Sequence, residues 1–204
     1  SIFLDSRQQA DRFQKELVNC YLKAQGRNIM LNHGDSLSVP LKEDVSVVAI
    51  GGGLTGVELV SELQYVVNSV SKYGLKSINP EDVKISLIEA SDRILPALDA
   101  ELSQEVQEKL VGMGIHVYTK TKVVRVEEHA MICEKDGKEL VIPSTLSAWC
   151  AGIKADEELK SPSLETNRLN QLIVNSHLQT TKDPNIFAIG DCSSYTPPGA
   201  ARPL

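Results

Sequence analysis

Apolar residues follow two alternating patterns along the middle of the chain. Short runs rich in valine, isoleucine and leucine cover residues 45–50, 83–89 and 115–118, and such runs are typical of buried strands in a parallel sheet. Between them, apolar residues recur every three or four positions, which predicts helices that cover a sheet with one face. The helix after residue 53 is expected to bury Val57, Val60, Leu63, Val67 and Val70. A second helix is expected over about residues 99–112, with Leu102, Val106 and Leu110 turned inward.

After residue 118 the pattern changes to short alternating segments. Residues 122–128, 130–135 and 139–142 predict strands, and Asp136-Gly137 predicts a tight hairpin turn between the last two. Residues 146–151 return as an apolar strand. This order predicts an α/β fold over residues 41–154, a Rossmann-like parallel sheet with helices and a small antiparallel β-meander layer.

The two ends of the chain carry less regular patterns. A helix is expected from residue 5 or 6 to about residue 24, ended by Gly26, and a loop or linker follows through residue 40. After residue 154 the chain is polar until residue 172. Residues 186–189 then predict a short buried strand that ends at Gly190 and Asp191.

Gly51, Gly53 and Gly56 form a G-x-G-x-x-G turn between the first predicted strand and the helix that follows it. In dinucleotide-binding folds the first glycine permits a tight turn, the second lets the backbone approach a pyrophosphate, and the third lets the helix pack closely on the strand. The pyrophosphate meets unpaired N–H groups and the positive end of the helix dipole. The predicted cofactor-binding loop comprises Gly51, Gly52, Gly53, Leu54, Thr55 and Gly56.

Glu89 ends the next predicted strand, where an acid accepts hydrogen bonds from the adenosine ribose of the dinucleotide. The gap from the glycines exceeds the usual spacing of about 20 residues, which predicts an insertion over residues 73–82. A 2′-phosphate within ~4 Å of this carboxylate is disfavoured by roughly 4 kcal/mol at an effective dielectric of ~20, so NADH is predicted over NADPH. Arg93, four residues on, can soften this preference. The alternative reading makes Glu89 an ordinary solvated acid at a strand end.

Composition restricts the function classes. The chain has 204 residues, of which 42% are hydrophobic and 24% charged, as in globular proteins. Its net charge of −6 argues against general nucleic-acid binding, and no apolar run approaches the ~20 residues that span a membrane. The four cysteines and four histidines show neither metal-ligand spacing nor a C-x-x-C, so no metal site is expected. A start at Ser1 without a methionine predicts a fragment or a processed chain.

Several motifs carry a resemblance to known flavoproteins. Residues 180–191 (TTKDPNIFAIGD) resemble the second flavin motif of two-dinucleotide flavoproteins. More specifically, residues 51–63 (GGGLTGVELVSEL), 87–90 (LIEA), 93–96 (RILP) and 149–155 (WCAGIKA) resemble type II NADH:quinone oxidoreductases. These are single-subunit, non-proton-pumping respiratory enzymes of bacteria, and the similarity spans essentially the whole chain.

The resemblance implies a role for each matching residue. The three motif glycines would hold the NADH pyrophosphate and Glu89 the adenosine ribose, while Ala151 and Gly152 would border the nicotinamide end of the groove. In the flavin motif, Asp191 would accept hydrogen bonds from the ribityl chain of FAD and Gly190 would admit its close approach.

Glu58 matches a glutamate that lies close to the nicotinamide and flavin rings in this family, which makes it the catalytic candidate. The alternative reading makes it a first-turn helix acid that the helix dipole stabilises. Both readings can hold together.

The resemblance also implies cofactors and partners. The parent enzyme would pass a hydride from NADH to FAD and two electrons on to a quinone, as a peripheral protein on the cytoplasmic side of a bacterial inner membrane and a possible homodimer. This chain has no second G-x-G-x-x-G for the FAD pyrophosphate and no match to the C-terminal membrane-binding part of the family. Residues 1–40 and 155–204 are therefore expected to be partial pieces of an FAD-binding domain. The chain itself is expected to be soluble, to hold no stable FAD and to be inactive.

Two alternatives stay open. A FAD-dependent disulfide reductase of the same architecture shares the glycine motif, although the thioredoxin-reductase arrangement would place a C-x-x-C in the nucleotide domain. A non-catalytic NAD(H)-sensing module also needs the glycine motif, but it has no use for Gly190 and Asp191.

Overall fold

The computed structural model describes residues 1–32, 45–69, 79–152, 154–161 and 163–200, with residues 27–32 described as helical backbone only. The chain divides into two compact units, Ser1–Ala151 and Gly152–Leu204. Each unit is described by itself. The candidate nucleotide-binding loop belongs to the first unit, and the flavin-like motif belongs to the second.

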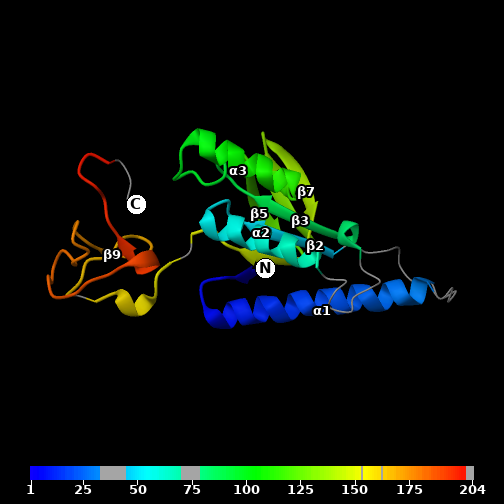
Figure 1. The fold of residues 1–204 in the computed structure, drawn as a ribbon, viewed down its shortest axis with the longest axis horizontal. Helices are drawn as coiled ribbons and strands as arrows, with labels where there is room; N and C mark the ends of the chain where they lie inside the picture. Colours follow the sequence, from blue (N-terminus) through cyan, green and yellow to red (C-terminus); the bar gives the residue numbers. More distant parts are fainter. Residues whose placement is uncertain (33–44, 70–78, 153, 162, 201–204) are drawn as a thin grey trace. The chain divides into compact units, whose positions relative to one another are not determined.

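The first unit is built on a five-stranded parallel sheet (Figure 1). Its spatial order is β1 (Ile2–Phe3), β8 (Leu146–Trp149), β2 (Val45–Ile50), β3 (Val83–Ile88) and β4 (His116–Tyr118). Strand β2 occupies the middle and is buried along its whole length, because both of its faces are covered. The predicted strands at 45–50, 83–89, 115–118 and 146–151 are thus confirmed to within two residues at each end.

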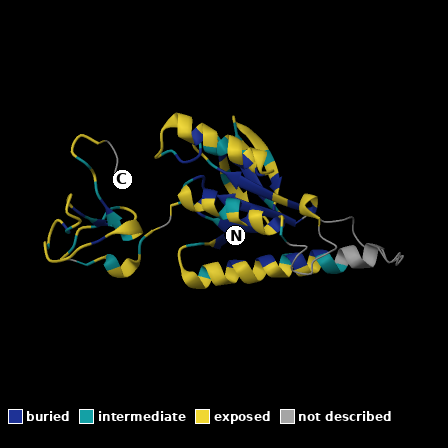
Figure 2. Cartoon of the chain, viewed as in Figure 1, coloured by how far each residue is buried: buried dark blue, intermediate teal, exposed yellow. Residues whose placement is uncertain are grey.

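Helices cover one face of this sheet and a three-stranded meander covers the other. One apolar cluster joins Val47, Ala49 and Leu87 to side chains of the helices α1 (Arg7–Asn32), α2 (Leu54–Val67) and α3 (Ala100–Gly112). A second cluster joins Val48 and Ile50 to the meander. Because side chains alternate between the faces of a strand, residues 45–50 contribute buried side chains to both the helical layer and the meander layer. Figure 2 shows these strands as the buried centre of the unit.

The meander consists of β5 (Thr121–Val126), β6 (Ala130–Lys135) and β7 (Lys138–Pro143), paired antiparallel in that order. Its three strands were predicted within a few residues of these bounds. Asp136 and Gly137 have φ of 52° and 72°, the left-handed conformation that the tightest hairpin turns require of both central residues. The predicted antiparallel layer is therefore confirmed.

Two helix predictions differ from the structure. Helix α1 continues through Gly26 to Asn32, because a glycine in a helix interior only weakens the helix, by about 1 kcal/mol relative to alanine. In α3, Leu110 is buried as predicted, but Leu102 is 44% exposed and its neighbour Ser103 is only 1% exposed. Val106 also packs against the core as predicted, so the prediction is wrong only at the first position of the stripe, where Ser103 faces inward in place of Leu102. Of the stripe on α2, Val70 lies outside the described residues.

The N-terminal segment belongs to the same unit as the central sheet. Strand β1 pairs parallel with β8, and Phe13, Leu17 and Tyr21 of α1 lie in the same apolar cluster as β2. This differs from the predicted domain boundary near residue 41. The sequence carries no local signal for this packing, because a two-residue strand has no periodicity and its partner lies more than a hundred residues away.

The second unit has little regular structure. Its described residues form two short parallel strands, β9 (Leu172–Ile173) and β10 (Ser193–Ser194), and two single-turn 3-10 helices, η3 (Glu157–Leu159) and η4 (Gly190–Cys192). Its small core is formed by Leu172, Val174 and Ala188. The remaining short element, η2 (Pro80–Asp82), lies in the first unit within the predicted insertion 73–82, of which only residues 79–82 are described.

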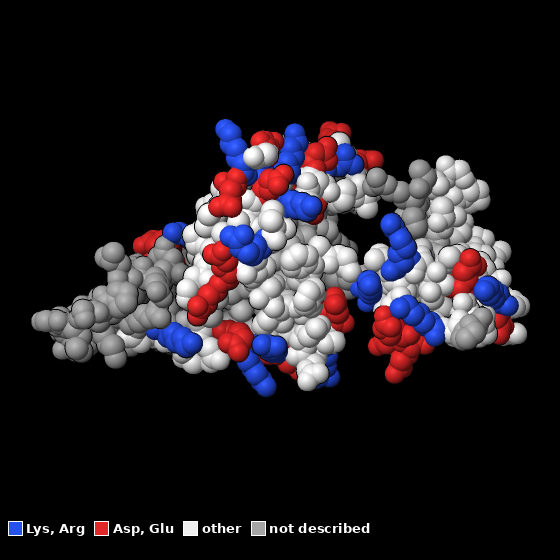
Figure 3. Space-filling view, turned by 180° about the vertical axis from the view of Figure 1, so that it is seen from behind, with Lys and Arg blue, Asp and Glu red and all other residues white. Residues whose placement is uncertain are grey.

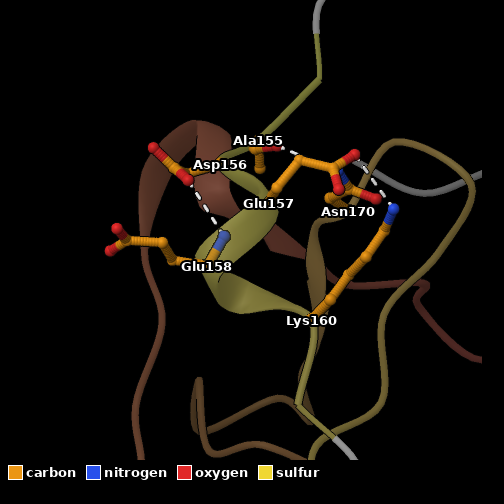
Figure 4. A network of polar contacts seen from close by, with 6 residues as sticks. All are labelled: Ala155, Asp156, Glu157, Glu158, Lys160 and Asn170. Atoms are coloured by element: carbon orange, nitrogen blue, oxygen red, sulfur yellow. Dashed lines mark hydrogen bonds and ion pairs between the residues drawn. The ribbon is translucent and has the colours of Figure 1, made fainter.

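Hydrogen bonds and an ion pair hold together the residues at the beginning of the second unit (Figure 4). The Asn170 side chain donates to the carbonyl of Ala155 (3.2 Å), and the Asp156 carboxylate accepts from the amide of Glu158 (2.9 Å). Lys160 lies 3.0 Å from Glu157, and this hydrogen-bonded ion pair lowers the pKa of the Glu157 carboxyl. These local bonds explain how a polar stretch without hydrophobic periodicity is ordered.

The buried strand predicted at residues 186–189 is not formed. Within the described residues, a single bridge between Gln179 and Phe187 is the only sheet-type pairing of this segment. Phe187 and Ile189 are 62% and 69% exposed, whereas Ala188 is buried. An apolar run becomes a buried strand only when neighbouring strands pair with it and cover it. In the described part of this unit, residues 186–189 pair with a neighbouring segment at one position only, so they stay largely exposed.

Candidate functional site

The candidate site lies where the order of the parallel sheet reverses. The chain leaves β2, crosses through α2 to β3 on one side, and later enters β8 on the other side of β2. Parallel sheets form a crevice at such a switch point, at the carboxyl ends of the two diverging strands. Gly51 follows β2 there and Ala151 follows β8 by two residues.

Gly51 and Gly56 hold the turn together by close backbone contact. Gly51 has a φ of 113°, and a Cβ atom at this position would lie 2.8 Å from the amide nitrogen of Ala151. A Cβ atom at Gly56 would overlap the carbonyl oxygen of Gly51. Both glycines are therefore required by the fold itself, and Ala151 lies directly against the glycine turn.

Gly52 and Glu89 are in contact. The Gly52 amide donates to one carboxylate oxygen of Glu89 (2.6 Å), and the Ser91 amide donates to the other (2.7 Å). A Cβ atom at Gly52 would lie 2.8 Å from the Cβ of Glu89, so only glycine lets the acid approach this closely. Each carboxylate oxygen has two lone-pair sites, so each retains one for a hydroxyl of a ligand.

Gly53 is the one motif glycine that the protein itself does not require. Its φ of −73° suits any residue, and a Cβ atom placed on it would meet nothing within 4 Å. It caps α2 without a side-chain bond, and the first intrahelical bond of this end runs from Val57 to its carbonyl (3.1 Å). The amides of Leu54, Thr55 and Gly56 therefore precede the helical bonding pattern and form an anion-binding helix terminus next to open space.

The described structure brings together part of the predicted site. Gly51, Gly52, Gly53, Gly56, Glu89 and Ala151 surround the switch point, with Leu54 and Thr55 at the start of α2. Glu58 is the fifth residue of α2 and is exposed. It therefore lies in the second helical turn, which corrects the first-turn reading and weakens its dipole stabilisation.

The remaining predicted site residues belong to the second unit. Gly152 begins it with a φ of 63°, and Gly190 and Asp191 form part of η4. Gly190 has a φ of 70° and a Cβ atom there would meet nothing within 4 Å, while Asp191 is exposed. The Asp191 carbonyl accepts from the Gln171 side chain (3.1 Å), which leaves its carboxylate on the surface. An open glycine backbone beside an exposed carboxylate fits a polyhydroxylated ligand such as the ribityl chain.

A sequence model of the family described as pyridine nucleotide-disulphide oxidoreductase matches residues 8–202 of the chain. The chain belongs to this family. The predicted fold class is confirmed, because the structure combines a parallel sheet and helices with an antiparallel layer.

Within the pyridine nucleotide-disulphide oxidoreductase family, the chain is similar to type II NADH:quinone oxidoreductases. A type II NADH:quinone oxidoreductase of Haemophilus influenzae is 39% identical over 95% of this chain, and one of Staphylococcus aureus is 32% identical over 79%. The chain spans 44% and 39% of the length of these two relatives. The resemblance to type II NADH:quinone oxidoreductases is thus confirmed.

A solved structure has the same fold. NDH2 from Plasmodium falciparum in complex with NADH matches 96% of this chain and 40% of its own chain, with a TM-score of 0.69 and 23% identity. At this identity the comparison concerns the fold. It supports the strand order and layers described above.

Burial makes three cysteines, Cys20, Cys133 and Cys150, poor nucleophiles. All four cysteines of the chain are free. Burial raises the pKa of Cys150 to about 11, and it also raises the pKa of Cys20 and Cys133. Because the thiolate is the reactive form, these environments suit structural cysteines better than a redox dithiol.

The described residues show neither a metal site beside the candidate site nor, on the face in Figure 3, a broad basic area. Figure 3 shows Lys and Arg side chains interspersed with Asp and Glu over one face of the molecule, without a broad basic area on that face. Among the described residues no group of three or more His, Cys, Asp or Glu side chains is placed to hold a metal ion. No helix in the described part of the chain is long and apolar enough to cross a membrane.

Two residues that hold the site were missed by the sequence analysis. The Leu95 amide donates to the carbonyl of Gly52 (2.7 Å), and the Trp149 indole donates to the carbonyl of Ala151 (3.1 Å). Trp149 also stacks at a tilt against Phe3, with ring centroids 5.8 Å apart. Neither contact has a signal in the sequence: the Leu95 bond joins loops that are distant in the chain, and the Trp149 bond depends on the direction that its side chain takes in the folded unit.

Proposed function

We propose that this chain forms the NADH-binding part of a flavin-dependent NADH:quinone oxidoreductase. The observation that carries the proposal is the pair formed by the open helix terminus at Gly53 and the Glu89 carboxylate held beside Gly52. The first offers amides to a pyrophosphate, and the second offers two free lone-pair sites to ribose hydroxyls. A dinucleotide carries both groups.

Each residue of the site then has a defined task. The amides after Gly53 bind the pyrophosphate of NADH, and Glu89 orients the adenosine ribose. Ala151, in contact with Gly51, and the adjoining Gly152 border the nicotinamide end. Glu58, exposed on the second turn of α2, is assigned to the neighbourhood of the nicotinamide and flavin rings. The redox step itself needs no side-chain nucleophile.

FAD fits the second unit in part, since Asp191 and Gly190 present a carboxylate and an open backbone for its ribityl chain. When bound, FAD would supply the hydride acceptor and relay two electrons to the quinone. Residues 155–204 are accordingly assigned to an FAD-binding domain. Residues 41–154 are assigned to the NADH-binding domain, and residues 1–32 join it through β1 and α1.

Quinones of respiratory chains dissolve in the lipid phase and NADH is produced in the cytoplasm. The proposal therefore places the whole enzyme at the cytoplasmic surface of a bacterial membrane, as a peripheral protein. A homodimer stays a prediction. The disulfide-reductase alternative is less well supported, because the 39% and 32% identical relatives are quinone oxidoreductases and the pKa of Cys150 is about 11.

Binding of NADH to this chain tests the proposal. Trp149 is the only tryptophan and contacts Ala151, so its fluorescence should fall as NADH binds. Glu89→Gln leaves one acceptor oxygen for two backbone amides and removes the charge, which should weaken NADH binding by about tenfold or more (about 1.4 kcal/mol).

Glu105→Gln is the matched control, because Glu105 is exposed on α3 and the charge change is the same. Unaltered Trp149 emission at millimolar NADH, or equal weakening by both variants, would refute the assignment of the site. Reduction of a quinone by NADH in the whole enzyme tests the activity separately, and an enzyme that reduces only disulfides would favour the alternative.

A further inference from the structure

Ser103 is a polar residue at a position where α3 faces the apolar core. Its side chain is 1% exposed, and its hydroxyl donates to the carbonyl of Ile94 at 2.6 Å. Ile94 is itself fully buried. A buried hydroxyl is costly unless it is hydrogen-bonded, so this contact is a specific connection between α3 and residues 91–98.

The residue after Ile94 connects this segment to the glycine turn. Leu95 has a φ of 46°, a left-handed conformation that is strained for leucine. Its amide donates to the carbonyl of Gly52 at 2.7 Å. Strained conformations persist only where the surroundings hold them, and the bonds at Ile94 and Leu95 hold this one from both sides.

Gly52 is therefore fixed at both of its backbone polar groups. Its carbonyl accepts from Leu95, and its amide donates to Glu89. Gly52 also directly precedes Gly53, where α2 and its free amides begin. A shift of the 91–98 segment would move both groups that the proposed NADH site presents to its ligand.

We propose that Ser103 is a positioning residue for NADH binding: its hydroxyl braces the 91–98 segment against the glycine turn and so sets the geometry of the Gly52–Glu89 pair. This inference rests on the proposed function. Ser103 contacts no ligand in this arrangement and acts through Ile94 and Leu95.

The test compares Ser103→Ala with Ser144→Ala in this chain. Ser144 is also buried (3% exposed), and its hydroxyl donates to the carbonyl of Leu146 at the amino end of β8, opposite the site. Both variants leave a buried carbonyl without its partner, so both should lose stability. Only Ser103→Ala should raise the dissociation constant for NADH, by about tenfold (about 1.4 kcal/mol).

A second readout does not depend on NADH. Hydrogen exchange at the Leu95 and Gly52 amides, followed by NMR, should speed up by about tenfold or more in Ser103→Ala relative to the central-strand amide of Val48, since local opening becomes easier. In Ser144→Ala these two amides should exchange at the same rate relative to Val48 as in the wild type. Should Ser103→Ala fail to fold, Ser103→Cys keeps the volume with a weaker donor and should show the same effects at reduced size.

The outcomes separate the two ideas. If the wild-type chain does not bind NADH, the proposed function is refuted. The hydrogen-exchange measurement then still tests whether the Ser103 hydroxyl holds the 91–98 segment against the glycine turn. Normal exchange at Leu95 and Gly52 in Ser103→Ala, or equal loss of NADH affinity in Ser144→Ala, overturns the positioning role of Ser103.

Discussion

The two glycines at positions 53 and 56 allow the fold requirement and the ligand requirement to be separated. A Cβ atom at Gly56 would overlap the carbonyl oxygen of Gly51 and lie 3.3 Å from the Leu87 side chain. A Cβ atom at Gly53 would meet nothing within 4 Å. We therefore expect Gly56→Ala to damage the fold, and Gly53→Ala to leave the fold intact while it obstructs the ligand.

The expected magnitudes differ widely. Gly56→Ala forces backbone displacement at a buried turn, which costs about 3 kcal/mol and lowers the melting temperature by roughly 6–12 °C in a chain of this size. Gly53→Ala changes the stability by less than about 1 kcal/mol, because reduced freedom of the unfolded chain offsets the poorer helix cap. Its methyl group occupies the space over the first amides of α2, and loss of a charge-assisted hydrogen bond there (about 1.5–3 kcal/mol) weakens NADH binding roughly 10- to 150-fold.

Thermal denaturation by circular dichroism measures the first effect, and NADH titration of Trp149 fluorescence measures the second. Gly112→Ala is the matched control. A Cβ atom added at Gly112 would also meet nothing within 4 Å, but this residue lies at the end of α3 and not in the glycine turn. Wild-type NADH affinity in Gly53→Ala would show that no pyrophosphate approaches this backbone. The reasoning from the open glycine would then be wrong.

Two further variants test other parts of the structure. Glu89→Arg replaces the acid beside Gly52 by a cation, so NADH should bind more weakly and NADPH relatively better, because a 2′-phosphate repulsion of up to about 4 kcal/mol becomes attraction; an unchanged ratio of the two dissociation constants contradicts the ribose assignment. Burial raises the pKa of Tyr21 from its ordinary 10.0 to about 12, so the stabilising effect of the protonated hydroxyl is complete below pH 10 and is lost as the pH rises toward 12. The loss amounts to about 2–3 kcal/mol by pH 12. Tyr21→Phe removes a buried hydroxyl without a partner in the described structure, and it should flatten this decline in the free energy of unfolding, measured with urea between about pH 9 and pH 12.

The sequence by itself determined the elements whose signals are local. The apolar run at 45–50, the glycine turn after it and the stripe on α2 predicted strand, turn and helix correctly, because each depends on residues close together in the chain. The hairpin at Asp136-Gly137 was predictable for the same reason. The family motifs added the flavin-like segment, which periodicity alone interpreted wrongly as a buried strand.

Only the tertiary structure decided which distant residues meet at the site. It paired β1 with β8, turned Ser103 rather than Leu102 toward the core, and brought the Glu89 carboxylate to the Gly52 amide. Such contacts depend on partners far apart in the chain, and the free energy that favours them comes from packing and buried hydrogen bonds, which leave no periodic trace in the sequence.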